Sequence, residues 1–196
     1  MSPDAPRLTA ALAALLLVVA CGSPEPDATS VSAKARVRAK TGAVWGRDLA
    51  SGLGLHPWEL CAELGAYDCL GEAHLIATGG VEPTVLGIDE PLTDGSVSAP
   101  IAYDRTAISA CGVRYDRDKA GPSVIFHKSA YAAPKAREVV AATLVQRLLA
   151  REPADAEVAA LVDLYDVLQP VSTDLDRDWA VGACVVVATS TEALFY

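Results

Sequence analysis

The sequence predicts a mainly α-helical domain of five to seven helices, and three observations lead to this fold class. Apolar residues in the second half of the chain recur at spacings of three and four, as along one face of a helix. Prolines and acidic residues stand where such helices would begin. Only the segment 123–127 (SVIFH) has the composition of a strand, and one strand does not make a sheet. We place the compact helical domain at residues 42–196.

Two short helices are expected first, at residues 43–50 and 57–64, with Gly65 as the C-cap of the second. Residues 78–97 are then rich in Gly, Pro and Asp, which predicts one long loop that is either functional or flexible. Its apolar side chains either form a contact site or fold back, and we expect them to complete the core. They are Val81, Val85, Leu86, Ile88 and Leu92.

Four helices are expected after this loop. The first begins at Ser98 and Pro100 and ends near Tyr115. Prolines open the next two, which cover residues 134–151 and 153–168, and Pro170 ends the second of them. A last helix is predicted to begin at Thr173, which with Asp176 resembles a capping box, and to run through Trp179, Val186 and Leu194.

The first 41 residues predict export and attachment to a membrane. Residues 8–20 form an apolar run of thirteen, too short to cross about 30 Å of hydrocarbon but typical of a secretory signal. The run ends at Cys21, and residues 18–21 (VVAC) resemble the lipobox of bacterial lipoproteins, whose cysteine is lipidated and becomes the mature N-terminus. We therefore predict a lipoprotein signal peptide at 1–20, and lipidated Cys21 with a flexible tether at 21–41. The alternatives are cleavage by an ordinary signal peptidase or a retained anchor.

This resemblance implies a place in the bacterial cell envelope. Several acyl chains on Cys21 would hold the domain at a membrane surface without crossing it. Residue 22 is Gly where inner-membrane lipoproteins of enteric bacteria carry Asp, which favours the outer membrane, facing the periplasm. The expected partners are this membrane and another envelope protein.

Four cysteines remain once Cys21 is assigned to lipid, and an even number in an exported chain favours disulfides. We prefer the pairs Cys61–Cys69 and Cys111–Cys184, although the last two cysteines are equally suited to be buried thiols in helical stripes. Zinc is the alternative, on the ligand set His56, Cys61, Cys69 and His74. The spacing lacks a close Cys-x2-4-Cys pair, so the disulfide is favoured and no metal is expected.

Two groups of acids suggest calcium but fit it poorly. The spacing D-x-D-x-D matches the start of a calcium-binding loop, and its residues are Asp174, Asp176 and Asp178. The later positions that need Gly and Glu in such a loop are occupied by Trp179 and Val185. These acids are expected to lie in the first turn of the last helix, near the positive end of its dipole. The loop acids are expected to be solvated, and they are Glu82, Asp89, Glu90 and Asp94.

Composition and motifs exclude several functions. The 196 residues include 16 Lys and Arg against 25 Asp and Glu, a formal net charge of −9, and 6% aromatic residues, which argues against binding to nucleic acid. No Gly-x-Ser-x-Gly elbow, Ser-x-x-Lys pair or phosphate loop occurs, so no nucleophile is placed beside His56, His74 or His127. We take His127 to be a structural histidine. The sequence therefore favours a protein that is not an enzyme, and no cofactor is expected.

About fifty residues near the end of the sequence resemble helical modules of large secreted bacterial proteins that are encoded with c-type cytochromes. In those modules an R-x-P-x-x-x-E-x-x-x-L helix precedes a helix that ends in Ser-x-x-Phe-Leu-Tyr. This chain orders the ending as Leu-Phe-Tyr and has no haem motif, so the resemblance implies a secreted helical module and no catalytic residue. The matching residues are Arg151, Pro153, Glu157, Leu161, Tyr165, Ser190 and 194–196.

These observations favour a lipid-anchored envelope protein that acts as a binding or assembly component. An accessory role in periplasmic metal or electron-transfer chemistry is the alternative, and it would use the cysteines and histidines between residues 56 and 74. A hydrolase with an unrecognised site is a third hypothesis.

Overall fold

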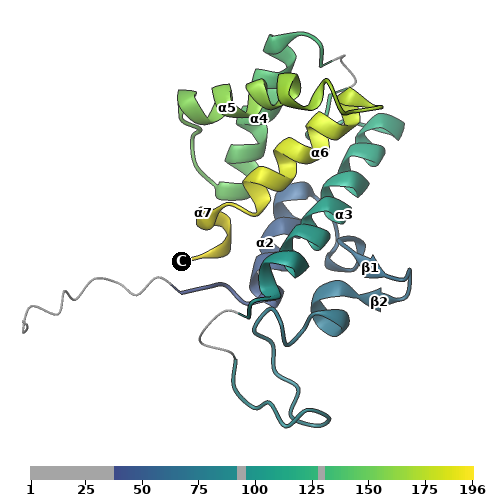
Figure 1. Cartoon of the computed structure of the whole chain (residues 1–196), viewed down its shortest axis with the longest axis vertical. Helices are drawn as coiled ribbons and strands as arrows, with labels where there is room; N and C mark the ends of the chain where they lie inside the picture. Colours follow the sequence, from purple (N-terminus) through teal and green to yellow (C-terminus); the bar gives the residue numbers. More distant parts are fainter. Residues whose placement is uncertain (1–37, 92–95, 128–130) are drawn as a thin grey trace, which may run out of the picture. The chain divides into compact units, whose positions relative to one another are not determined.

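The structure is a computed structural model, and it describes residues 38–91, 96–127 and 131–196. Within these ranges it contains six α-helices and one two-stranded sheet, so the prediction of a mainly α-helical domain with five to seven helices is confirmed (Figure 1). Cys21, the predicted signal peptide and most of the predicted tether lie outside the described residues. No helix in the described ranges is both long enough and apolar enough to span a bilayer.

The first half of the domain holds two long helices, α2 (Gly42–Leu53) and α3 (Ala99–Ala120). The predicted starts of both helices agree with the structure, although α3 continues past Tyr115 to Ala120. Short elements lie between them: the 3₁₀ turn η1, the antiparallel strands β1 and β2, and the π-helical turn η2. Their bounds are Pro57–Glu59, Ala62–Glu63, Tyr67–Asp68 and Cys69–Ala73.

The helix predicted at 57–64 is wrong, because the chain turns into a hairpin there. Leu64 and Gly65 both have positive φ, 53° and 72°, a conformation that breaks a helix and reverses the chain. Gly65 is thus the turn of a hairpin and not a C-cap. The disulfide between Cys61 and Cys69 closes this hairpin at its base, with 5.5 Å between the two Cα atoms.

The second half contains α4 (Pro134–Leu149), α5 (Asp155–Leu168), α6 (Leu175–Ala188) and the short α7 (Thr191–Leu194). The first two were predicted with nearly these bounds. The single last helix is divided in two, because Ser190 leaves the helical path and caps α7 through its side chain. The N-cap of α6 is Asp174, not Thr173, and its carboxylate accepts the Arg177 N–H.

The segment 123–127 is not a strand. Its backbone N–H groups have no neighbouring strand; those of Val124, Ile125 and Phe126 instead donate to the Asp118 carboxylate at 2.8–2.9 Å. Asp118 is fully buried and also pairs with Arg114 at 2.7 Å. The apolar residues of this segment therefore form a bend that packs into the core. The buried Asp118 carboxylate holds the backbone of the bend in place.

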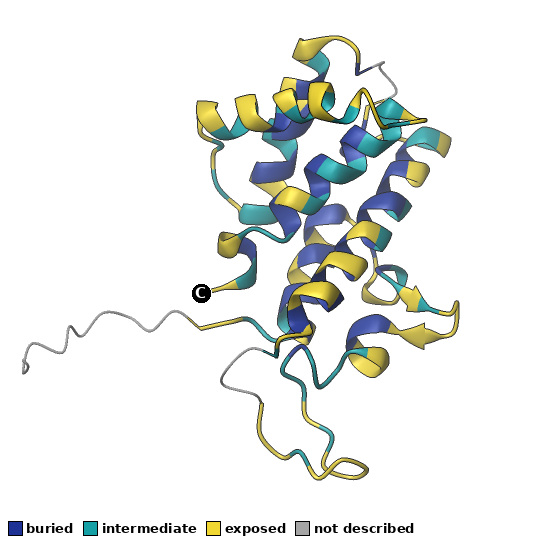
Figure 2. Ribbon diagram, in the orientation of Figure 1, coloured by how far each residue is buried: buried dark blue, intermediate teal, exposed yellow. Residues whose placement is uncertain are grey.

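The core lies between α2, α3, α4 and α6, whose inner faces are buried (Figure 2). Trp45 of α2 and Trp179 of α6 are its largest side chains, and each indole N–H donates to a backbone carbonyl, of Ala188 and Leu161 respectively. The second disulfide joins Cys111 of α3 to Cys184 of α6, with Cα atoms 6.0 Å apart. Both predicted cysteine pairs are therefore present in the structure.

Candidate functional site

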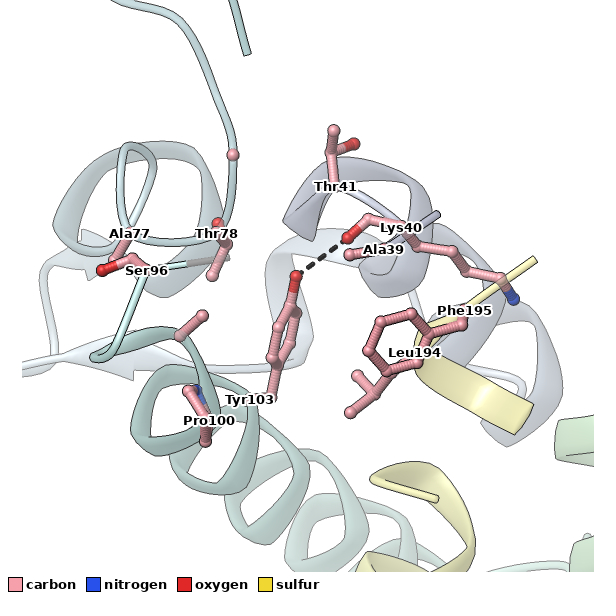
Figure 3. Close-up of a pocket in the computed structure, with 12 residues that line it drawn as sticks. Ala39, Lys40, Thr41, Ala77, Thr78, Ser96, Pro100, Tyr103, Leu194 and Phe195 are labelled. Atoms are coloured by element: carbon pink, nitrogen blue, oxygen red, sulfur yellow. Dashed lines mark hydrogen bonds between the residues drawn. The ribbon is translucent and has the colours of Figure 1, made fainter. Parts of the chain in front are cut away.

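A pocket of about 270 Å³ opens at the end of the domain where the chain enters α2 and α3 begins (Figure 3). We call it the entry pocket. Its wall comes from four places that are distant in sequence: residues 39–41, the loop around Thr78, the start of α3, and the end of α7 with Phe195. Backbone hydrogen bonds hold the first and last of these together, since Lys40 N–H donates to Leu194 at 2.8 Å and Tyr196 N–H to Arg38 at 3.0 Å.

The entry pocket is mostly apolar, and two of its polar side chains have hydrogen-bond partners within the protein. The Tyr103 hydroxyl donates to the Lys40 carbonyl at 2.9 Å, and burial raises the pKa of Tyr103. The Thr78 hydroxyl donates to the His74 carbonyl at 3.0 Å. With these groups satisfied, the pocket offers mainly hydrophobic contact to a ligand. The apolar side chains of the wall are Ala39, Ala77, Ala99, Pro100, Leu194 and Phe195.

The loop that follows Thr78 projects a closed turn, residues 82–88, which we call the finger. Glu82 and Ile88 exchange backbone hydrogen bonds of 3.0 and 3.2 Å, and the Glu82 carboxylate accepts the N–H groups of Thr84 and Val85. The expectation that the apolar loop residues complete the core is wrong for this part of the loop. Val85 is 81% exposed and Leu86 57% exposed, because the closed turn holds them at the tip.

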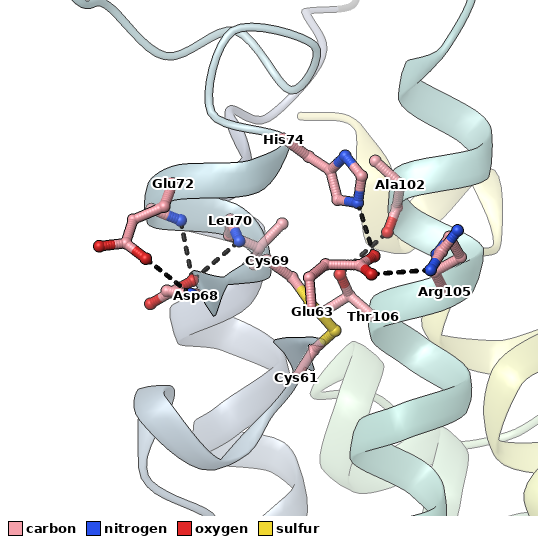
Figure 4. Close-up of a disulfide and its surroundings, with 11 residues drawn as sticks. Cys61, Glu63, Asp68, Cys69, Leu70, Glu72, His74, Ala102, Arg105 and Thr106 are labelled. Atoms are coloured by element: carbon pink, nitrogen blue, oxygen red, sulfur yellow. Dashed lines mark hydrogen bonds and ion pairs between the residues drawn. A yellow bond between two sulfur atoms is a disulfide. The ribbon is translucent and has the colours of Figure 1, made fainter. Parts of the chain in front are cut away.

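A second cluster surrounds the Cys61–Cys69 disulfide (Figure 4). Glu63 of β1 bridges two side chains: its Oε1 lies 3.0 Å from His74 Nε2, and its Oε2 accepts a hydrogen bond from Arg105 Nη2 at 2.8 Å. The hydrogen bond to His74 and the charge of Arg105 lower the pKa of Glu63, so it is ionised at neutral pH. An open cavity of about 280 Å³ lies beside this cluster and reaches Cys61.

The four predicted zinc ligands do not all meet. Cys61 and Cys69 are bonded to each other, and His74 faces Glu63. His56 points elsewhere, because its ring stacks on Trp58 with the centroids 4.3 Å apart. Sequence reasoning missed Glu63, since it lay in the wrongly predicted helix. A hairpin prediction from Leu64-Gly65 would have placed it on the same strand as Cys61.

The acids considered for calcium have other roles. Asp174 caps α6, and Asp176 and Asp178 lie in its first turn, as predicted. Of the loop acids, Glu82 closes the finger, Asp89 and Glu90 are exposed, and Asp94 lies outside the described residues.

The remaining histidine, His127, is exposed at the end of the bend. His127 Nδ1 lies 3.4 Å from Ser123 Oγ, but that hydroxyl donates to the Phe126 carbonyl at 2.8 Å. The Ser123 hydroxyl therefore stabilises the bend and does not donate to the imidazole.

Two of the residues that resemble the secreted helical modules, Arg151 and Glu157, take part in an ion-pair network. Arg151, after α4, pairs with Glu157 of α5 and with Glu192 of α7, at 2.6 and 2.8 Å. The hydrogen bonds from Arg151 lower the pKa of both carboxyls, that of Glu157 to about 2. Glu157 also accepts the Ala154 N–H at the start of α5. These residues thus join the end of α4 to α5 and α7.

Comparison of the chain with protein-family models, with curated proteins and with solved structures finds no match.

Proposed function

We propose that this protein is a lipid-anchored binding component of the bacterial envelope, and that its partner binds at the entry pocket and the finger. The observation that carries this proposal is the position of both features. The pocket wall includes residues 39–41, and the finger begins three residues after Gly79, which also lines the pocket. Apolar surface is thus offered at the end of the domain where the predicted tether enters.

The chemistry of this end defines the kind of partner. The entry pocket accepts an apolar side chain, and the exposed Val85 and Leu86 extend the hydrophobic contact. Asp89 and Glu90 lie exposed after the finger, so cationic groups beside an apolar patch would complement it. We therefore expect a second envelope protein with an apolar segment flanked by Lys or Arg.

Site-specific photo-crosslinking in intact cells tests the binding surface. A photoreactive residue at Leu86 is expected to give one adduct of defined mass, while the same residue at Val171, 78% exposed after α5, gives none. Ala77→Phe, which fills the entry pocket, should reduce the Leu86 adduct severalfold. Equal adduct yields from Leu86 and Val171 would contradict the proposal. A Leu86 adduct yield that Ala77→Phe leaves unchanged would also contradict it.

The anchor needs its own experiment. The intact mass of protein extracted from membranes should include lipid on Cys21 and lack residues 1–20. Cys21→Ser should release the protein from the membrane fraction. An unmodified Cys21 in the extracted protein would rule out lipid attachment at this residue.

A second candidate function is supported by the cluster around Cys61–Cys69. A half-buried disulfide beside a histidine, a carboxylate and an open cavity suits an accessory role in metal or redox chemistry.

A further inference from the structure

We infer that reduction of the Cys61–Cys69 disulfide converts this cluster into a zinc site with the ligands Cys61, Glu63, Cys69 and His74. The inference rests on the second candidate function and gives it a specific site. It differs from the ligand set that the sequence suggests, because Glu63 takes the place of His56.

Donor atoms of three of the four residues already converge in the oxidised protein, and His74 contacts this group through Glu63. The sulfurs of Cys61 and Cys69 and a carboxylate oxygen of Glu63 all lie within 4.8 Å of one another. His74 Nε2 lies 3.0 Å from Glu63 Oε1. Two thiolates around a tetrahedral zinc ion stand about 3.8 Å apart, given Zn–S bonds of about 2.3 Å. Breaking the S–S bond therefore requires only a small separation of the sulfurs.

The backbone explains why these four residues meet. Cys61 and Glu63 lie at the start of the hairpin, and Cys69 follows β2. The turn η2 then closes with a π-type hydrogen bond from the His74 N–H to the Cys69 carbonyl, 2.8 Å long. This wider turn returns His74 to the hairpin, where it reaches Glu63 (Figure 4).

Accessibility separates the two disulfides. Cys61 is half-buried and lines the open cavity, although its partner Cys69 is fully buried. Cys111 and Cys184 are both fully buried, so the second disulfide has no accessible cysteine. A dithiol reductant attacks Cys61 through its thiolate and forms a mixed disulfide, and Cys69 leaves as a thiolate that takes up a proton. The second reductant thiol then releases the Cys61 thiol, so the reductant becomes a disulfide. One Zn²⁺ then displaces two protons from the two thiols.

The surroundings balance the charge of the loaded site. Two thiolates and the Glu63 carboxylate exceed the charge of Zn²⁺ by one, and Arg105 supplies the compensating positive charge on the other oxygen of Glu63. His74 would bind through Nε2 and carry its proton on Nδ1. The mixed sulfur, nitrogen and oxygen set is one that zinc accepts.

The experiment uses purified protein with Cys21→Ser and has two readouts. Mild reduction, followed by alkylation and peptide mass analysis, measures which cysteines become free. After anaerobic removal of the reductant, titration with Co²⁺ measures metal binding through the thiolate-to-cobalt absorption, and Zn²⁺ should displace the Co²⁺. We expect Cys61 and Cys69 to be alkylated first, one Co²⁺ per reduced chain, and no such absorption from the oxidised protein.

Two matched variants keep every cysteine and separate the ligand sets. Glu63→Gln should weaken Co²⁺ binding about tenfold or more, and His56→Ala should leave it unchanged. Loss of binding in His56→Ala with full binding in Glu63→Gln would overturn the assignment. Selective release of Cys61 and Cys69 without cobalt absorption would also overturn the metal site, while leaving a redox-active pair. Simultaneous release of all four cysteines would overturn the accessibility argument. Circular dichroism of each reduced variant confirms that the compared samples are folded.

Discussion

The Asp118 carboxylate accepts the backbone N–H of Phe126 at 2.8 Å, eight residues further along the chain. It accepts two more N–H groups from the same bend and pairs with Arg114, all in a buried position. One side chain thus takes the place of a neighbouring strand for the segment 123–127.

Asp118→Asn should therefore be strongly destabilising. The substitution leaves the Arg114 guanidinium buried without its counter-charge, and loss of one partner of a buried pair costs about 3–5 kcal/mol. Urea denaturation measures this loss of unfolding free energy. Asp116→Asn is the control on the same helix, because Asp116 is exposed and 3.5 Å from Arg177, and should change stability by about 0.5 kcal/mol or less. Equal losses in the two variants would contradict the role given to Asp118.

The two disulfides should contribute unequally to stability. The Cys111–Cys184 bond closes a loop with a sequence separation of 73, whereas the Cys61–Cys69 bond closes a loop with a sequence separation of only 8. Chain entropy then gives about 4 kcal/mol for the first and about 2.5 kcal/mol for the second. Guanidinium denaturation of the two double alanine variants measures both values. A larger loss from the short loop would show that contacts around the hairpin outweigh chain entropy.

The Arg151 network should make stability depend on pH. The pKa of Glu157 is lowered to about 2 and that of Glu192 is lowered as well, so both carboxyls stabilise the fold at pH values above about 4.5. This stability is lost as the pH falls from about 4.5 towards 2. Arg151→Gln should therefore differ from the unsubstituted protein by a constant amount at neutral pH, and by less at acidic pH.

Arg147→Gln is the control for that experiment, because Arg147 donates to the Gly52 carbonyl at 2.7 Å and not to a carboxylate. Its effect on unfolding free energy should be the same at pH 3 and pH 7. Chemical denaturation across this range measures both variants. An Arg151→Gln effect that stays constant down to pH 2 would exclude the pKa shifts as its cause.

Two glycines in helices should respond to alanine in opposite ways. A Cβ at Gly52 of α2 would lie 2.8 Å from the Arg147 carbonyl oxygen, so Gly52→Ala must push α2 away from α4 at a cost of about 1–3 kcal/mol. At Gly182 of α6 the nearest atom is 3.6 Å away, and Gly182→Ala should stabilise by about 0.5–1 kcal/mol. Thermal unfolding measures both changes. A stabilising Gly52→Ala would disprove close approach of the two helices.

The helices were predictable where local signals decide them. Pro134 and Pro153 open α4 and the turn before α5, and apolar spacing gives their inner faces. The wrong predictions concern segments whose conformation is set by contacts that the apolar pattern does not encode. Residues 123–127 depend on Asp118, and the hairpin after Cys61 depends on a disulfide and two residues with positive φ.

The candidate sites were predictable only in part. The cysteine pairing follows from their number and positions, but the Glu63–His74 contact needs the hairpin that the sequence analysis replaced with a helix. The entry pocket joins Ala39, Thr78 and Phe195, which no local pattern relates. The sequence likewise did not predict the double ion pair of Arg151, because Glu192 lies 41 residues away.

The pairing of Arg38 and Lys40 with residues 194–196 also has a mechanical consequence. A force applied to the chain before Arg38 is borne first by these backbone hydrogen bonds and only then by α2. The load passes through α7 into α6, and from Cys184 across the disulfide to α3. Tension applied through the leading segment is thus shared by α7, α6 and α3.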